Sequence, residues 1–265
     1  MPPSPADHPG PAGPPGGVVE RAAAAAQVLV DDPAAPVLAV PDAHHLSRVL
    51  RLRPGEVVVA TDGRGRWCRC RYRGGRGRGD DVGPDRLLEP DGPVRFEPAP
   101  APSITVAFAP VKADRPEWVV QKLTELGVDR IVPLVTARSV VRWDGDRADR
   151  AADRLRRVAA GALGQCRRVW LPDVTDPCGL AVLASDPVLG PGGLALAQLG
   201  GDRPTAATTA VAIGPEGGWA PDELAAATAT VGLGPLVLRA ETAAVAAGAI
   251  LAGLRTGTVG VEATP

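Results

Sequence analysis

Residues 211–219 read Val-Ala-Ile-Gly-Pro-Glu-Gly-Gly-Trp, an apolar run that leads directly into a glycine-rich loop. The pattern predicts a buried strand, a tight turn and the start of a helix. Ligands of open α/β sheets bind at such carboxyl ends of strands, where glycines let the backbone approach a ligand. A phosphate-binding loop is disfavoured, because Glu216 puts negative charge in the turn and no Lys-Ser or Lys-Thr pair follows. A plain tight turn remains an equal alternative to a ligand site.

A second segment of the same kind spans residues 233–243 and reads Leu-Gly-Pro-Leu-Val-Leu-Arg-Ala-Glu-Thr-Ala. It predicts a strand over residues 236–238, a short loop and a helix over residues 242–254. The dipole of that helix accounts for Glu241 but not for Arg239 beside it. Two such loops at neighbouring strand ends would form an uncharged, backbone-lined slot suited to adenine and a methionine tail.

The rest of the C-terminal half alternates strands with helices, which is typical of a parallel α/β sheet. The predicted strands are residues 104–109, 131–135, 194–198 and 210–213. The predicted helices are residues 114–127, 147–163 and 221–230, the second of them rich in arginine.

The N-terminal half has the short strands and glycine turns of a small β-barrel. Its predicted strands are residues 27–30, 37–40, 56–61, 66–71 and 86–88, with a helix over 43–51. The Pro-rich stretch 97–102 predicts a linker between an N-terminal domain, 18–96, and a C-terminal domain, 103–265. Residues 1–17 are rich in Pro and Gly and predict a disordered tail.

Composition is that of an ordinary globular protein with a net charge of −1, so overall charge does not indicate a nucleic-acid partner. No apolar run is long enough to cross a bilayer and no secretory signal begins the chain, so we expect a cytoplasmic protein. The four cysteines match neither a disulfide framework nor a zinc site, and we expect no metal. Arginines crowd residues 64–78 around Trp67 and Tyr72, which indicates either an RNA-gripping patch or a solvated loop.

These loops occur with two further motifs, Trp-Val-Val-Gln-Lys-Leu-Thr-Glu-Leu-Gly-Val at 118–128 and Arg-Ser-Val-Val at 138–141. Together they resemble the family that makes 3-methyluridine in 16S ribosomal RNA, which belongs to the SPOUT class of methyltransferases. The stretch His-Leu-Ser-Arg-Val-Leu-Arg-Leu-Arg-Pro-Gly at 45–55 is similar to the PUA-like RNA-binding domain of that family. The resemblance extends from about residue 27 to the end of the chain.

The resemblance implies an α/β fold, with an N-terminal PUA-like β-barrel and a C-terminal parallel-sheet domain that contains a trefoil knot. It implies S-adenosyl-L-methionine as cofactor, a homodimer, and 16S ribosomal RNA or the small ribosomal subunit as partner. By the match, the cofactor-binding residues are Gly214, Pro215, Glu216, Gly217, Gly218, Leu233, Gly234, Leu238, Arg239, Glu241, Thr242 and Ala243.

Methyl transfer to uridine N3 removes a proton and leaves negative charge on the flanking carbonyl oxygens, which an arginine can stabilise. By motif position the catalytic candidates are Arg138 and Arg239, with Glu125 as a candidate base. Expected RNA contacts are Arg48, Arg51, Arg53, Lys112 and Lys122. An ordinary solvated ion pair is an equal alternative for Lys122 and Glu125.

The chain departs from the family at Gly164, where an acidic residue is expected before Gln165. Glycine in a helix interior costs about 1 kcal/mol relative to alanine, so we expect the helix to end there or another backbone to pack closely. Our hypothesis is that the acid is dispensable. The alternative functions are methylation of a ribose 2′-hydroxyl or another base, and a catalytically silent RNA-binding assembly factor.

Overall fold

The computed structural model describes residues 16–74, 83, 86–111, 115–139, 141, 143 and 145–260. The predicted tail, residues 1–17, lies outside this range except for its last two residues, which belong to a helix. The N-terminal elements are α1 (Gly16–Ala22), β1 (Ala26–Leu29), α2 (Val40–His44), the π-helical turn η1 (His45–Val49), β2 (Val57–Thr61), β3 (Arg66–Tyr72), β4 (Leu88–Pro90) and β5 (Arg95–Phe96).

The C-terminal elements follow from residue 105 onward. They are β6 (Thr105–Phe108), α3 (Arg115–Glu125), β7 (Arg130–Val135), α4 (Asp146–Cys166), β8 (Asp173–Val174), β9 (Cys178–Gly179), α5 (Leu180–Ala184), the 3-10 turn η3 (Pro187–Leu189), β10 (Ala195–Asp202), β11 (Ala210–Ile213), α6 (Pro221–Ala225), β12 (Ala229–Val231) and α7 (Ala240–Thr256). Among the described helices none is long and apolar enough to cross a membrane.

The N-terminal domain is one mixed sheet in the order β1-β2-β3-β4, with β5 also paired to β3. Only the β1–β2 pair is parallel. Alternate residues of these strands point to one core, where Val28, Val58 and Cys70 meet Leu46 of η1. Because η1 is anchored by Leu46, its other residues remain at the surface.

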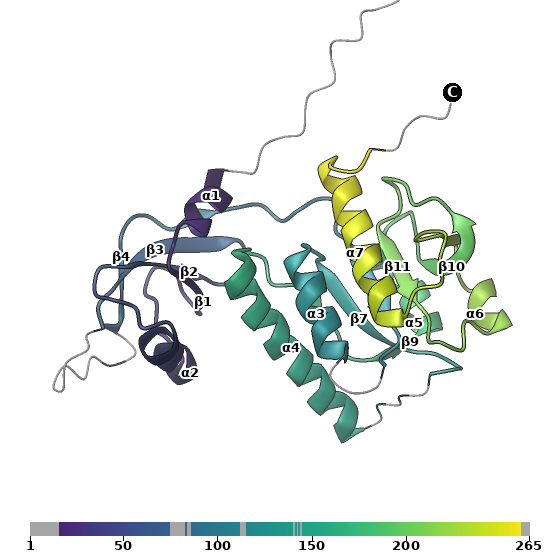
Figure 1. Ribbon diagram of the computed structural model, residues 1–265, viewed down its shortest axis with the longest axis horizontal. Coiled ribbons are helices and arrows are strands. Elements are labelled where there is room, and N and C mark those ends of the chain that lie inside the picture. Colours follow the sequence, from purple (N-terminus) through teal and green to yellow (C-terminus); the bar gives the residue numbers. More distant parts are fainter. Residues whose placement is uncertain are drawn as a thin grey trace, which may run out of the picture.

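The C-terminal domain has a parallel sheet in the order β12-β10-β11-β6-β7-β8, with β9 also paired to β7. Side chains that alternate along each strand face two separate cores. Val106 and Ile131 pack against α3, α4 and α7, whereas Ala107 and Val132 pack toward α5. Figure 1 shows α3, α4 and α7 on one face of this sheet, so the domain has three layers.

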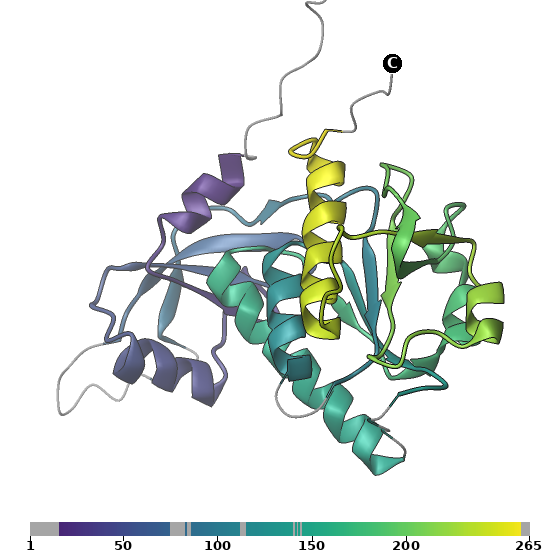
Figure 2. The same ribbon diagram turned by 45° about the vertical axis from the view of Figure 1, so that its right-hand side comes forward.

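Buried polar contacts join the two domains where the end of α4 meets β1. Arg21 is 2% exposed, pairs with Glu97, and donates from Nε to the carbonyl oxygen of Arg167 at 2.8 Å. Its guanidinium lies 5.1 Å from the centroid of the Trp67 ring. Gln27 of β1 donates to carbonyl oxygens near the end of α4. Figure 2 shows the two domains side by side, with this end of α4 against the N-terminal sheet.

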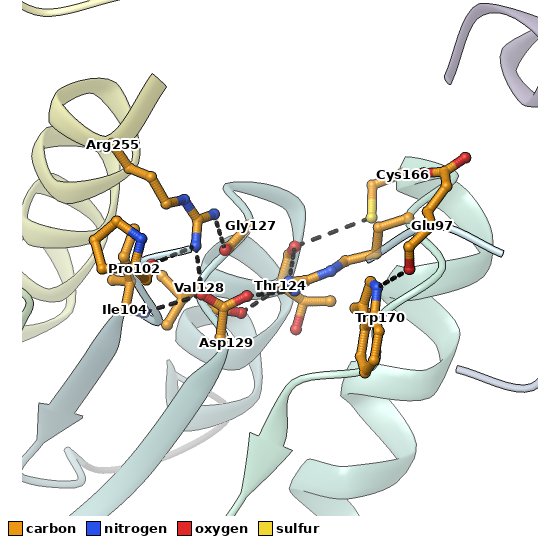
Figure 3. A network of polar contacts seen from close by, with 11 residues as sticks. Glu97, Pro102, Ile104, Thr124, Gly127, Val128, Asp129, Cys166, Trp170 and Arg255 are labelled. Atoms are coloured by element: carbon orange, nitrogen blue, oxygen red, sulfur yellow. Dashed lines mark hydrogen bonds and ion pairs between the residues drawn. The ribbon is translucent and has the colours of Figure 1, made fainter. Parts of the chain in front are cut away.

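Asp129 is a second polar centre, at the amino edge of the C-terminal sheet (Figure 3). Its carboxylate accepts hydrogen bonds from the backbone N–H of Ile104 at 2.9 Å and pairs with Arg168 and Arg255. One carboxylate therefore ties the starts of β6 and β7 to the ends of α4 and α7. Arg168 also donates to backbone oxygens at the end of α3.

The structure corrects three predicted elements. Residues 37–40 form no strand, because Pro36 and Pro41 flank them and each lacks a backbone N–H for a sheet ladder. Residues 236–238 form a loop rather than a strand, with Leu236 74% and Val237 84% exposed. The edge strand is instead β12 (Ala229–Val231), which overlaps the last two residues of the helix predicted at 221–230. Strands β5, β8 and β9 were missed, since each has only two residues.

Candidate cofactor and catalytic site

A cavity of about 560 Å³ opens at the carboxyl ends of β10 and β11. Its walls come from strand β10, from the loops after β7 and β11, from α6 and from the segment that leads into α7. The lining residues are Arg138, Ala197, Gln198, Leu199, Ile213, Gly214, Pro215, Glu216, Gly218, Trp219, Leu224, Leu233, Gly234, Leu236, Val237, Leu238, Arg239, Ala240 and Ala243.

The loop after β11 is shaped by Trp219. The indole Nε1 donates to the carbonyl oxygen of Ala197 at 3.0 Å, which ties this loop to β10. A Cβ atom on Gly214 would lie 3.0 Å from the Trp219 ring, so any other residue would press on the indole. Gly218 has φ +69°, a left-handed conformation that favours glycine. These contacts bring the backbone of Gly214 and Gly218 to the cavity wall.

Arg138 is held at the cavity wall by the same loop. Its guanidinium donates to the carbonyl oxygen of Gly217 at 2.8 Å. The preceding residue, Ala137, donates its N–H to Glu223 of α6 at 2.8 Å, and Glu223 also accepts from Ala220. Glu223 therefore links the Arg138 segment to the start of α6. The sequence reasoning missed it, although Pro221 and Glu223 have the spacing of a helix start.

The segment before α7 supplies a second arginine. Arg239 is exposed and occupies the N-cap position of α7. Glu241, two residues on, is not part of the wall and pairs instead with Arg115 of α3 at 3.2 Å. Glu241 thus holds the start of α7 to α3 and positions the segment around Arg239.

Most predicted cofactor residues gather at the cavity. Three predicted residues do not line it. Gly217 packs against Arg138, Glu241 pairs with Arg115, and Thr242 is exposed outside the cavity. The two loops do not follow neighbouring strands, since β10 lies between β11 and β12. The middle of β10, with Ala197, Gln198 and Leu199, therefore forms a third part of the wall that the sequence reasoning missed. The glycine pair Gly200-Gly201, which directly follows these residues, was the available signal.

The structure does not bring Glu125 or Lys122 to this cavity. Both lie near the end of α3, which leads into the amino end of β7, on the opposite edge of the sheet. Lys122 Nζ is 2.9 Å from Glu125 Oε2, as expected for the ordinary ion pair. Lys112 lies outside the described residues.

The predicted RNA contacts Arg48, Arg51 and Arg53 are exposed around the end of η1. Arg51 has φ +54°, a conformation that non-glycine residues adopt rarely and often at functional sites. These three basic side chains therefore lie around one irregular turn.

The arginine-rich stretch 64–78 is largely paired. Arg66, Arg69, Arg71 and Arg73 pair with carboxylates of the same domain. Trp67 is 1% and Tyr72 2% exposed, so neither ring can stack on RNA bases. Arg76 and Arg78 lie outside the described residues. The base-stacking interpretation of this patch is wrong for the two aromatic residues.

Cys68 and Cys70 are buried thiols, whereas Cys166 and Cys178 are partly exposed. Burial raises the pKa of the Cys70 thiol to about 12, and it also raises the pKa of Cys68. In the part of the chain that the structure describes, no group of three His, Cys, Asp or Glu side chains could hold a metal ion.

Comparison with known proteins identifies both domains. Residues 97–252 match the RNA methyltransferase domain family, and residues 38–78 match the RNA methyltransferase PUA domain family. The chain is 37% identical to the "Ribosomal RNA small subunit methyltransferase E" of Mycobacterium bovis, over 84% of this chain and 88% of that protein. It is 27% identical to the protein of the same name from Bacillus subtilis, over 76% and 83%.

Solved structures have the same fold. A probable rRNA-methyltransferase from Porphyromonas gingivalis superposes with a TM-score of 0.69 at 27% identity, covering 88% of this chain and all of that one. The ribosomal RNA small subunit methyltransferase E of Neisseria gonorrhoeae, solved bound to S-adenosyl methionine, gives a TM-score of 0.67 at 24% identity, covering 86% and 97%.

A parallel-sheet domain with a cavity at its strand ends, preceded by a PUA domain, defines an RNA methyltransferase of two domains. The chain belongs to the ribosomal RNA small subunit methyltransferase E family. The fold class and the family implied by the motifs are thus confirmed. The trefoil knot stays a prediction.

Proposed function

We propose that the chain transfers the methyl group of S-adenosyl-L-methionine to N3 of a uridine in small-subunit (16S) ribosomal RNA. The observation that supports this most is the cavity, because its wall combines glycine backbone, apolar side chains and two arginines. Relatives that match most of the chain are named for methylation of small-subunit ribosomal RNA. The choice of uridine N3 rests on the motifs at 118–128 and 138–141.

The cavity suits this cofactor in size and chemistry. Its volume of about 560 Å³ lies within the range of roughly 300–1,000 Å³ typical of small-molecule sites. Leu233, Leu238 and Trp219 provide apolar surface for an adenine ring and a methionine tail. Gly214 and Gly218 leave backbone groups free to approach a ligand. When bound, the cofactor supplies a methyl group that is already activated by its positive sulfur.

The residues of the chain must then align the RNA base and stabilise the charge that develops on it. We assign this charge stabilisation to Arg138 and Arg239, which lie on opposite segments of the wall. Gly217 fixes the Arg138 guanidinium, whereas Arg239 has no partner among the described residues and is free to contact the base. An arginine fork can donate two hydrogen bonds to uridine oxygens.

Glu216 is the carboxylate that lines the described cavity, and we assign to it the acceptance of the N3 proton. Its side chain is exposed on the loop that also holds Arg138. Glu125, the candidate from the sequence, is less suitable because it lies at the other edge of the same sheet and pairs with Lys122.

The proposal includes a cytoplasmic homodimer in which residues 18–96 dock RNA, residues 97–102 connect, and residues 103–265 carry out the transfer. Large apolar side chains around the cavity support a partner subunit at this edge. Leu199 is 57%, Leu236 74% and Val237 84% exposed. Covering such side chains on association would remove apolar surface from water.

The test is transfer from labelled cofactor to small-subunit RNA or to the intact subunit, followed by mass spectrometry of the nucleosides. We expect 3-methyluridine as the product. Arg138→Ala and Arg239→Ala should each lower the single-turnover rate at saturating cofactor about 100-fold. Arg73→Ala, in a surface ion pair with Glu89, should leave the rate unchanged. A product methylated on the ribose or another base would contradict the assignment.

A further inference from the structure

Helix α4 has a row of arginines that the cavity does not use. Arg147, Arg150, Arg154 and Arg157 follow one another at intervals of three and four residues, so they form one stripe along the helix. The opposite side of α4 is the buried one, with Ala152, Leu155, Ala159 and Ala162 in or against the core. The arginine stripe therefore faces away from the domain interior.

Three of the four arginines in this stripe have no partner in the part of the chain that the structure describes. Among the described residues, no carboxylate or backbone oxygen pairs with Arg147, Arg150 or Arg157, and all three are exposed. Arg154 pairs with Glu117, and Arg156, on another side of the helix, pairs with Asp153 and Asp176. Arginines without an internal partner are available to bind an external anion.

Helix α4 connects the edge of the cavity with the N-terminal domain. The helix begins shortly after Arg138, at the edge of the sheet where the cavity opens. It ends at the N-terminal domain, where Arg167 donates to Ala24 and Gly164 contacts Gln27. Figures 1 and 2 both show α4 running from the N-terminal sheet across the methyltransferase domain. Its 21 residues span about 31 Å.

Three carboxylates of α4 stand next to arginines of the stripe in the sequence, and each has a local role of its own. The acidic residues Asp146 and Asp149 lie in the first turn, where the helix dipole stabilises them. Asp153 is neutralised by Arg156. From Arg147 to Arg157 the unpaired arginines extend over about 15 Å along the axis, which is the length of several consecutive phosphates of a nucleic-acid strand.

We infer that the stripe of Arg147, Arg150 and Arg157 is a phosphate-binding track that holds the RNA backbone between the N-terminal domain and the cavity. The track rests on the proposed function, since it assigns a route to the RNA that this function methylates. The RNA leaves the basic turn around Arg51, crosses α4 through its phosphates, and places one base at the cavity. The contacts are to the backbone, so they position the RNA without reading its sequence.

The track is tested with the full chain and a fluorescein-labelled transcript of small-subunit ribosomal RNA. In the variant Arg147→Gln/Arg150→Gln/Arg157→Gln we expect RNA affinity to fall at least 10-fold near 0.15 M salt. The slope of log affinity against log salt should lessen by about 2, as expected for three lost contacts to a single strand. The KM for RNA should rise while kcat and the affinity for S-adenosylmethionine stay within two-fold.

Two single variants provide a matched comparison on one helix. Arg150→Gln should weaken RNA binding several-fold, whereas Arg156→Gln, which removes the same charge from a paired arginine, should not. Unchanged RNA affinity and an unchanged salt slope in the triple variant would overturn the track. This is also the result expected if the stripe binds a protein instead of RNA. An equal loss of cofactor affinity would also overturn it, because the stripe would then only support the fold.

The failure of the track and the failure of the proposed function give different results. If the unsubstituted chain methylates RNA and the triple variant does so with the same KM, the function stands and the track is overturned. If the unsubstituted chain binds RNA through these arginines but transfers no methyl group, the track stands and the proposed function fails.

Discussion

A Cβ atom on Gly164 would lie 2.9 Å from the carbonyl oxygen of Gln27. Gly164 belongs to the last turns of α4 and Gln27 to β1, so this contact joins the two domains. The Gln27 side chain reinforces it by donating to Leu163 and Arg168. The absence of the expected acid at position 164 thus has a steric reason, because the strand backbone occupies the space of any side chain.

This contact adds a cost in stability for Gly164→Glu that the hypothesis of a dispensable acid did not include. Gly164→Ala should destabilise the chain by about 1–3 kcal/mol because it overpacks the domain contact, and Gly164→Glu by at least as much. Urea unfolding measures the change.

The matched control is Gly161→Ala, because Gly161 lies three residues earlier on α4 with open space around its Cβ position. That change should stabilise the helix by about 1 kcal/mol. Equal effects of alanine at positions 161 and 164 would show that the strand does not press on α4.

The buried pair of Arg21 and Glu97 should respond asymmetrically to substitution. Glu97→Gln leaves the Arg21 charge buried without a counter-charge, which should cost about 3 kcal/mol. Arg21→Met removes that charge and keeps apolar contact with Trp67, so its cost should be smaller. Thermal unfolding of both variants gives the order.

A surface pair of the same charges serves as the control for this asymmetry. Asp91→Asn breaks the pair with Arg71, whose side chain is 47% exposed, and should cost less than about 1 kcal/mol. If Glu97→Gln lowered stability as little as Asp91→Asn, the contact between the two domains would not depend on the charge of Glu97.

Gly218 and Gly257 separate backbone strain from ligand contact. Their φ angles are +69° and +70°, but Gly218 lines the cavity whereas Gly257 ends α7. Alanine at either position should lower stability by about 1 kcal/mol. Only Gly218→Ala should weaken binding of S-adenosylmethionine, by several-fold in calorimetry, because its loop must relax. Equal affinities of the two variants for S-adenosylmethionine would show that the Gly218 loop does not contribute to the cofactor site.

The thiol of Cys70 should be inert at neutral pH. Burial raises its pKa to about 12 in the folded chain, above the ordinary value of 9.0, so the protonated form is favoured by folding. This contribution to stability is complete below pH 9 and is lost as pH rises from 9 toward 12. Iodoacetamide at pH 8 should leave Cys70 unmodified in the folded chain and modify it in urea, as mass spectrometry of peptides would show. Rapid labelling of the folded chain would contradict the burial.

The sequence by itself determined the elements with a strong local signal. Strand β11 was predicted residue for residue, because four apolar residues run into a loop that needs glycine. The long helix α4 was also expected, since its apolar residues recur at helical spacing. Motif order further indicated the family, and Gly214, Gly218 and Arg138 were named before their arrangement was known.

Only the tertiary structure decided which of these residues meet. Gly217 and Glu241 belong to the motifs but support the wall from behind, through Arg138 and Arg115. Ala197 and Leu199 line the cavity without any motif, because β10 lies between β11 and β12 in the sheet. Strand order is a non-local property, set by the packing of helices on both faces, and local pattern does not encode it.

The same distinction explains the arginines and Gly164. Sequence shows where charges are placed along the chain, but the partners of a charge come from distant segments, as with Arg21 and Glu97. Arg147 and Arg150 remain available because α4 turns them away from the domain, whereas Arg71 is paired. The sequence showed that glycine at position 164 is unusual for the family. Only the structure showed the reason, which is the close approach of β1 to α4.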